Sequence, residues 1–379
     1  MTSRERLLKV LHGEIPDCVP VAPDTSNMIP ARLTGKPFWD LYLYQDPPIW
    51  KAYIDCVKHF GFDSLMDGYA PIQFEELGEI DPSWTEMIIS RDNNRIITQR
   101  CRRDGSRMHW HNRVNVYYRD NPPFHNVVPA SLELPDVPER YEPVEGVRSW
   151  PRGEALLKLV RGEMGDYGLV GVFCGTTIVV GSEQALYDYQ ENPDVYHARR
   201  DRLIEYFTKR LHHLMSLSVK PDFICTGGSG TLIWQTPPMF RELGLPIVRE
   251  ITALCRRYGI PSQIHSCGPE RELVKMAAEE TDLTVIDPLE VPPMGDCDLK
   301  NIKKLYGNKL VLKGNLHTTR IMLEGTPEDV AAASRQAIDD AAAGGRFILS
   351  TGDQCGRDTP DANIRAMIDT ARTYGRYSR

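Results

Sequence analysis

The 379-residue chain lacks any long apolar run. Its longest runs, such as Leu169–Cys174, are far shorter than the ~20 residues that a membrane-spanning helix needs. No apolar segment follows the charged start of the chain, so we expect no secretory signal peptide. A basic block is also missing: 45 Lys and Arg stand against 52 Asp and Glu, a net charge of −7. These absences argue against a membrane or a nucleic acid as a partner.

Paired cysteines are not indicated either. The count of nine is odd, and the residues are scattered over the whole chain, so a disulfide framework is not expected. A reducing compartment, the cytoplasm, with metal-binding or structural thiols fits better. We find no internal repeat and no low-complexity segment. Hydrophobic content of 41% and charged content of 26% are typical of a globular protein.

Short apolar runs, each followed by an amphipathic stretch typical of a helix, recur along the chain. Several runs are apolar at nearly every position, as in parallel strands that are buried on both faces. The eight runs are Cys18–Ala22, Phe62–Met66, Leu169–Phe173, Asp222–Cys225, Ser262–His265, Leu283–Ile286, Lys309–Leu312 and Phe347–Ser350. Eight such units predict a (β/α)8 TIM barrel in one domain, residues 1–379. A doubly wound open sheet is the alternative, but no G-x-G-x-x-G motif follows the first run.

The second and third runs are too far apart for one crossover. The intervening segment, about residues 72–147, contains a hairpin-turn sequence at Arg91–Arg95 and alternating runs at Ile96–Thr98 and Val114–Tyr117. We therefore predict a small β-rich insertion between strands two and three. Its His109–His111 segment is either a solvated hairpin with an aromatic anchor or a lid or partner surface.

Polar and metal-binding residue types gather where the eight runs end, which is where TIM barrels place their chemistry. In chain order they include Asp24, Asn27, Asp67, Cys174, Thr176, Ser229, His265, Cys267, Asp287, Glu290, Asn315, His317, Asp353 and Cys355. A barrel that served only as a scaffold would not require this concentration.

A zinc site is the sharpest hypothesis among them. His265 and Cys267 stand two positions apart at a strand end, so their side chains point to the same side. Cys355 follows the last strand, across the barrel from the fifth. Imidazole and two thiolates suit Zn²⁺ with an open fourth position. The alternative is that each is an ordinary packed or hydrogen-bonded residue.

Two acidic residues and one glycine-rich turn are further candidates. Glu290 is either a zinc ligand or general acid/base, or else a salt-bridge or capping residue, and Asp353 is similar. Gly227–Gly230, which contains Ser229, lacks the helix start and the lysine of a phosphate site. With Trp234 nearby, it suits a flat or macrocyclic ligand.

At these residues the chain resembles the uroporphyrinogen decarboxylase superfamily. The resemblance covers nearly the whole chain and rests on Arg4–Val21, Lys313–Leu316 and Thr351–Met367 in that order. It implies a (β/α)8 barrel. Members either decarboxylate uroporphyrinogen without a cofactor or catalyse zinc-dependent methyl transfer to or from a corrinoid.

The methyltransferase branch is the closer match. The arginine-bearing loop of the decarboxylases is replaced by Ala22–Met28, and Asp353 stands where they carry a histidine. His265, Cys267 and Cys355 match the methyltransferase zinc ligands in type and strand. The last cysteine comes two positions later than in many methyltransferases, so Glu290 or Asp353 is an alternative third ligand.

The resemblance thus implies a zinc-dependent methyltransferase or demethylase. It would move a methyl group between a small O-, N- or S-methylated substrate and a corrinoid (methylcobalamin) that a separate corrinoid protein supplies. Glu290 and Asp353 would serve the chemistry. The substrate-binding residues would be Asn27, Asp67, Ser229 and Asn315. A lyase acting on a polycarboxylate, with Arg357 or Lys313 as its cation, and a non-catalytic corrinoid-binding barrel remain alternatives, and a homodimer is left open.

Overall fold

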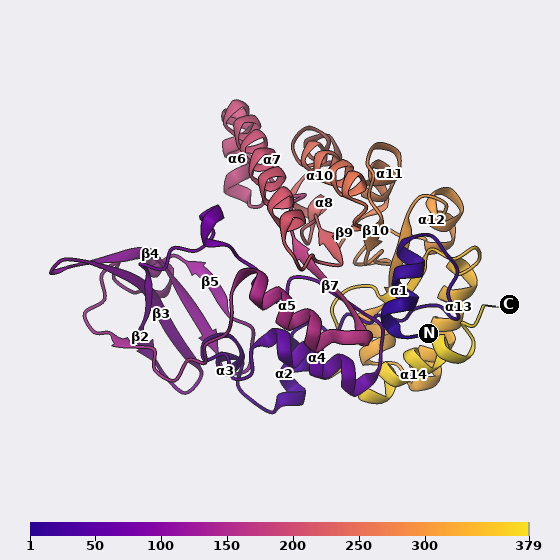
Figure 1. Ribbon diagram of the computed structural model, residues 1–379, viewed down its shortest axis with the longest axis horizontal. Coiled ribbons are helices and arrows are strands. Elements are labelled where there is room, and N and C mark those ends of the chain that lie inside the picture. Colours follow the sequence, from indigo (N-terminus) through magenta and orange to yellow (C-terminus); the bar gives the residue numbers. More distant parts are fainter. Residues whose placement is uncertain (378–379) are drawn as a thin grey trace. The chain divides into compact units, whose positions relative to one another are not determined.

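The computed structural model describes residues 1–377, which divide into two compact units (Figure 1). The first unit comprises Met1–Thr25, Val57–Gly68 and the chain from Leu157 onward. The second comprises Ser26–Cys56 and Tyr69–Leu156. Each unit is described by itself below.

A parallel sheet of seven strands forms the centre of the first unit, in the order β1-β7-β8-β9-β10-β11-β12. The strands are β1 (Ser64–Met66), β7 (Gly168–Phe173), β8 (Phe223–Cys225), β9 (Ser262–His265), β10 (Val285–Asp287), β11 (Val311–Leu316) and β12 (Phe347–Thr351). Each overlaps one of the predicted runs. Nearly all of their residues are buried, as the continuous apolar runs predicted.

The remaining predicted run, Cys18–Ala22, joins the two ends of this sheet. Ala22 N–H donates to the carbonyl of Leu349 in β12, and Leu349 N–H donates to Pro20, both at 2.8 Å. On the other side, Asp63 N–H donates to the carbonyl of Val21 at 2.8 Å. The first run therefore lies between β12 and β1, and the predicted (β/α)8 fold class is confirmed.

Helices α10 to α14 follow one another around the outside of the strands in Figure 1. The α-helices of the first unit are α1 (Ser3–Leu11), α6 (Glu183–Glu191), α7 (Pro193–Ser216), α8 (Thr231–Trp234), α9 (Pro237–Met239), α10 (Leu245–Tyr258), α11 (Arg271–Glu280), α12 (Leu299–Tyr306), α13 (Pro327–Ala341) and α14 (Asp361–Thr373). A 3-10 turn, η3 (Gly165–Tyr167), and two π-helical segments, η4 (Phe240–Gly244) and η5 (Thr318–Leu323), complete it. Local signals set some of the helix starts: Thr326 forms a capping box with Asp329 ahead of α13.

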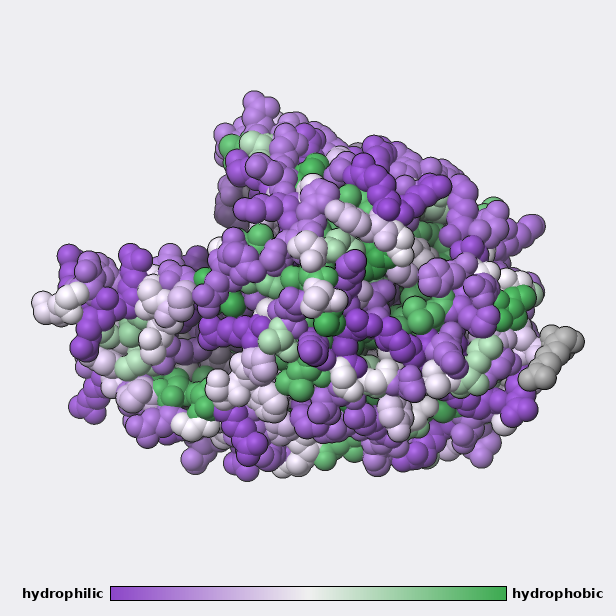
Figure 2. Space-filling model, viewed as in Figure 1, coloured by the Kyte–Doolittle hydropathy of each residue, from purple (hydrophilic) through white to green (hydrophobic). Residues whose placement is uncertain are grey.

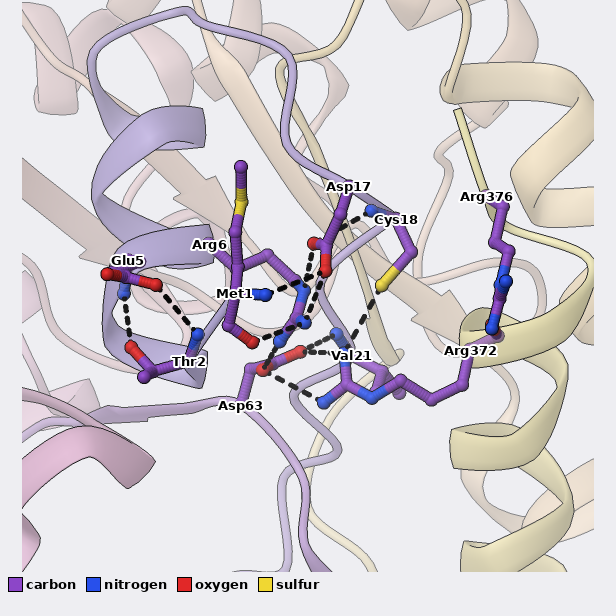
Figure 3. Close-up of polar contacts among 10 residues, drawn as sticks. All are labelled: Met1, Thr2, Glu5, Arg6, Asp17, Cys18, Val21, Asp63, Arg372 and Arg376. Atoms are coloured by element: carbon purple, nitrogen blue, oxygen red, sulfur yellow. Dashed lines mark hydrogen bonds and ion pairs between the residues drawn. The ribbon is translucent and has the colours of Figure 1, made fainter. Parts of the chain in front are cut away.

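A buried carboxylate holds the start of the barrel together (Figure 3). Asp63 is fully buried and accepts hydrogen bonds from Arg6 of α1 at 2.8 Å and from Arg372 of α14 at 2.9 Å. Its second oxygen accepts Val21 N–H at 2.9 Å. Arg6 also pairs with Asp17 at 2.8 Å. One carboxylate thus connects the first helix, the last helix and the first strand segment.

The second unit is built on an antiparallel sheet in the order β5-β4-β3-β2-β6. The strands are β2 (Thr85–Arg91), β3 (Arg95–Asp104), β4 (Arg107–Tyr118), β5 (Phe124–Val127) and β6 (Glu142–Pro143). The predicted hairpin turn connects β2 to β3, and the two predicted alternating runs lie in β3 and β4. The β-rich insertion between the second and third barrel strands is therefore confirmed.

Short helices accompany that sheet. They are α2 (Met28–Thr34), α3 (Phe38–Tyr42), η1 (Glu75–Leu77) and η2 (Pro129–Leu132). Two helices, α4 (Ile49–Phe60) and α5 (Gly153–Met164), contain residues of both units. The second unit thus includes Ser26–Cys56 in addition to the predicted insertion.

Side chains from the barrel strands and from α1 fill the interior of the first unit. The cluster contains Leu7, Val10, Leu11, Ala22, Leu65, Leu169, Phe223, Cys225, Val285, Val311 and Ile348. On the face shown in Figure 2, hydrophilic residues predominate and hydrophobic ones form small separate groups. Within residues 1–377, no helix is both long and apolar enough to cross a membrane.

Candidate metal centre

The candidate site lies where β9, β10, β11 and β12 end. His265 is the last residue of β9 and Asp287 the last of β10, and the two are partners in the parallel register. Cys267 and Glu290 follow these strands by two and three residues. Asp353 follows β12 by two. The sheet register therefore brings together residues that are far apart in the sequence.

Asp287 is the centre of a buried polar network. Its Oδ2 accepts hydrogen bonds from His265 Nδ1 at 3.0 Å and from Lys313 Nζ at 2.8 Å. Its Oδ1 accepts from Gln263 Nε2 at 2.7 Å, and the same amide lies 3.3 Å from Asp67 Oδ2. The side chains of Asp287 and Lys313 are 1% and 8% exposed. Because Nδ1 of His265 faces Asp287, the other ring nitrogen is directed elsewhere.

Three potential ligands converge beside that imidazole. The Cys267 sulfur and one carboxylate oxygen each of Glu290 and Asp353 lie within 4.8 Å of one another. His265 Nε2 lies 3.6 Å from Asp353 Oδ1. Gly268 N–H donates to Glu290 Oε2 and fixes that carboxylate. Asp353 has a φ of 151°, a conformation that side-chain-bearing residues seldom adopt and that is often found at functional sites.

Acidic groups dominate the electrostatics. Burial raises the pKa of Asp67 to about 6, with Asp287 and Asp24 adding repulsion against the attraction of Lys313. Burial and the neighbouring Asp353 raise the pKa of Glu290.

Asp287 and His265 have pKa values that their neighbours shift against the effect of burial. Burial would raise the pKa of Asp287, but Lys313 and His265 hold it at about 2. Burial disfavours the charged His265 ring, yet the hydrogen bond to Asp287 and the nearby Cys267 leave its pKa well above the usual value. The site therefore gathers negative charge around a proton-bearing imidazole, an arrangement that favours a bound cation.

The residues present fit a zinc ion. His265 Nε2 is buried and has no hydrogen-bond partner among residues 1–377, although a buried polar nitrogen normally has one. It lies beside the cluster of one thiol and two carboxylates, 3.6 Å from Asp353 Oδ1. Imidazole, thiolate and carboxylate are the zinc donor set, with bond lengths of about 2.0–2.3 Å that the cluster can accommodate. Fixing Nδ1 by a carboxylate is the usual support of a zinc-binding histidine.

Cys355 lies outside this cluster. Its residue is 1% exposed, and its backbone N–H donates to the carbonyl of Asp24 at 2.8 Å. Burial raises the pKa of this thiol to about 12, against the lowering effect of the nearby Thr351 and Thr359 hydroxyl groups. The structure thus brings together His265, Cys267 and the two acids, and places Cys355 among threonines.

The four predicted substrate-binding residues have different surroundings. Asp67 follows β1 and joins the Asp287 network through Gln263. Asn315 lies in β11, is 8% exposed and donates to the carbonyl of Leu289 at 3.0 Å. Ser229 is exposed in the turn after β8. Asn27 belongs to the second unit, where it donates to the hydroxyl of Tyr42 at 2.9 Å.

A small pocket adjoins the cluster on the side of Glu290. It is lined by Glu290, Val291, Met294, His317, Thr318 and Gly352. His317 Nδ1 accepts the backbone N–H groups of Thr319 and Arg320 at 3.2 and 3.3 Å. Its Nε2 is therefore the nitrogen that carries the ring proton in the neutral form. The pocket combines apolar walls with one carboxylate and one imidazole.

Sequence reasoning missed the supporting role of Gln263, Asp287 and Lys313. From the sequence, Asp287 is only a strand-end residue and Lys313 only a possible cation for a polycarboxylate. A signal was present: a lysine next to an apolar strand run requires a buried counter-charge. The sequence did not indicate which acid supplies it.

The fold and this cluster define a (β/α)8-barrel protein with a zinc-type donor set at the carboxyl ends of its strands. The family model for uroporphyrinogen decarboxylase (URO-D) matches residues 157–374, more than half of the chain. The chain belongs to this family.

Two curated relatives are methylcobamide:CoM methyltransferases named MtbA, from Methanosarcina mazei and Methanosarcina acetivorans. Each is 27% identical to this chain, over 137 and 135 residues. Each match covers 36% of this chain and 37% of the relative, so it spans little more than a third of those proteins. A solved methyltransferase from Methanosarcina mazei superposes with a TM-score of 0.60 at 14% identity, covering 99% of both chains. That likeness supports the fold.

Proposed function

We propose that this protein is a zinc-dependent methyltransferase or demethylase that moves a methyl group between a small methylated substrate and a corrinoid carried by a partner protein. One observation carries the proposal: His265 Nε2, buried without a hydrogen-bond partner, lies beside the cluster of Cys267, Glu290 and Asp353. Membership of the URO-D family and the partial match to two methylcobamide:CoM methyltransferases support the reaction class.

Each residue of the cluster has a distinct part in this proposal. His265, Cys267 and the carboxylates of Glu290 and Asp353 would hold the zinc ion, with Cys355 as the alternative ligand from the last strand loop. Bound zinc supplies a Lewis acid that lowers the pKa of a substrate heteroatom. Asp287 orients the imidazole through its hydrogen bond to Nδ1.

A lyase acting on a polycarboxylate is less well supported. Such a substrate needs free cationic side chains. Lys313 is buried and engaged by Asp287 at 2.8 Å, and Asp67 also attracts it. The carboxylates around His265 would repel a polyanion. The surroundings of Lys313 therefore favour a cation at this site over a polycarboxylate.

Methyl transfer can be tested with free cobalamin in place of the partner. We expect zinc-loaded protein to demethylate methylcobalamin in the presence of one thiol of a small panel, seen as a change in cobalamin absorbance. The reverse assay offers cob(I)alamin with methoxyaromatic, methylamine, betaine and thioether donors. Cys267→Ala should lose activity in both directions while keeping the circular dichroism spectrum of the parent.

A matched variant separates the site from general damage. Cys255→Ala removes a buried thiol from α10, away from the cluster, and should leave turnover unchanged. Equal activity in Cys267→Ala and the parent would refute the proposed site. Turnover of uroporphyrinogen instead of methylcobalamin would favour the lyase.

A further inference from the structure

The hairpin formed by β3 and β4 in the second unit carries a concentration of positive charge that the proposed chemistry does not use. Between Arg95 and Arg113 the chain has six arginines and one acidic residue, Asp104, although the whole chain has a net charge of −7. In Figure 2, hydrophilic residues are the most frequent ones over the part of the second unit where Figure 1 labels β3 and β4. The charge of this segment is thus opposite to that of the chain as a whole.

One face of the hairpin is covered by the chain itself. Gln99 is fully buried and donates to the carbonyl of Asp136 at 2.8 Å. Trp110 contacts the ring of Tyr141, with centroids 5.0 Å apart. Cys101, the register partner of Trp110, is 4% exposed. The segment that leads into β6 therefore packs on this side.

The opposite face presents arginine and aromatic side chains. Arg102 lies over the ring of Trp84, 5.2 Å from its centroid, and His111 packs edge-on against the same ring at 5.5 Å. Arg100 Nη2 lies 3.5 Å from His111 Nε2. Arg102 is also the register partner of His109. We call Trp84, Arg100, Arg102, His109 and His111 the arginine face.

Nearby acids neutralise the positive charge of this face only in part. Glu86 is the register partner of Arg100, but its Oε1 accepts hydrogen bonds from the side chains of Thr98, Asn115 and Tyr117. Asp81 is hydrogen-bonded by Ser83, and Arg102 also attracts its carboxylate without an ion-pair contact. Within residues 1–377, neither Arg100 nor Arg102 forms an ion pair, and both are exposed. Their guanidinium groups retain donors for an external acceptor.

We infer that the arginine face is a docking surface for an acidic segment of a partner protein. Exposed guanidinium groups that are held by ring contacts lose little freedom when they bind carboxylates, and they bind them in a bidentate manner. Arginine and tryptophan are also the residues most enriched at the energetic centres of protein interfaces. This inference goes beyond the proposed function and does not depend on it.

A labelled peptide of ten glutamates is the probe. We expect it to bind the full-length protein at near-physiological salt, measured by fluorescence anisotropy. The double variant R100Q/R102Q should weaken binding by about tenfold or more, because it removes the two positive charges that attract the acidic peptide. R100K/R102K keeps the charge but lacks the planar guanidinium group. Its affinity for the peptide should lie between those of the parent and R100Q/R102Q.

The control removes two exposed arginines elsewhere. R256Q/R257Q on α10 makes the same change of charge at side chains that are 75% and 65% exposed, and should leave the affinity within about twofold. Absence of peptide binding, or equal loss in both double variants, would overturn the inference. Tighter binding of a thymidine 20-mer than of the peptide would assign the face to nucleic acid instead.

Discussion

His265 and Asp287, which end adjacent parallel strands, share a hydrogen bond of 3.0 Å between Nδ1 and Oδ2. The bond leaves Nε2 of the imidazole facing Asp353 beside Cys267 and Glu290. The same Asp287 oxygen accepts from Lys313, so a buried ion pair supports the histidine. The imidazole is therefore oriented by side chains of three adjacent strands, whereas Cys267, Glu290 and Asp353 lie in the segments that follow strands.

Asp287→Asn should weaken zinc binding without removing any proposed ligand. The substitution removes the carboxylate that fixes the imidazole, and loss of such a supporting group typically lowers metal affinity by about 10–100-fold. Competition with a chromophoric chelator measures the affinity. The matched control Asp282→Asn alters an acid that pairs with exposed Arg256 and should keep parental affinity. Identical affinities for parent and Asp287→Asn would show that the histidine needs no such support.

Zinc binding should release protons and weaken as the pH falls. The raised pKa of His265 means that the ring holds its proton near neutral pH, and the raised pKa values of Glu290 and Asp353 extend proton competition to lower pH. A ligand must be unprotonated to bind zinc, so protons compete with the ion. Calorimetry in buffers of different ionisation enthalpy should detect about one or more protons released per zinc at pH 7. An affinity that is constant between about pH 6 and 8 would contradict this assignment of ligands.

The two cysteines near the site should respond differently to substitution. Cys267→Ala removes a member of the cluster and should reduce zinc affinity by several orders of magnitude. Cys355→Ala should retain zinc, because Thr351 and Thr359 surround that sulfur. Asp353→Asn separates the alternatives further and should weaken binding. Loss of zinc from Cys355→Ala, with retention in Asp353→Asn, would make the thiol the third ligand.

Asp63→Ala should destabilise the barrel by about 3–5 kcal/mol, because it removes the buried carboxylate that pairs with both Arg6 and Arg372 and leaves Arg6 with Asp17 alone. Urea unfolding monitored by circular dichroism measures the change in free energy. The control Lys9→Met breaks an exposed pair with Glu14 and should leave the unfolding midpoint almost unchanged. Similar midpoints for the two variants would show that the buried network adds little.

Local patterns predicted much of the barrel and part of the site. Apolar runs ending in polar residues located the seven strands of the parallel sheet, and the alternation of side chains placed His265 beside Cys267. The Asp287 network depends on the side-by-side register of β9, β10 and β11, which no local pattern encodes. The assignment of Ser26–Cys56 to the second unit likewise depends on contacts between distant segments.

The most direct test of the central claim is the zinc content of anaerobically purified protein, measured by plasma mass spectrometry beside Cys267→Ala. The account predicts about one zinc per chain in the parent and a large loss in the variant. A parent protein that holds no zinc after reconstitution would contradict the metal site and, with it, the proposed methyl transfer.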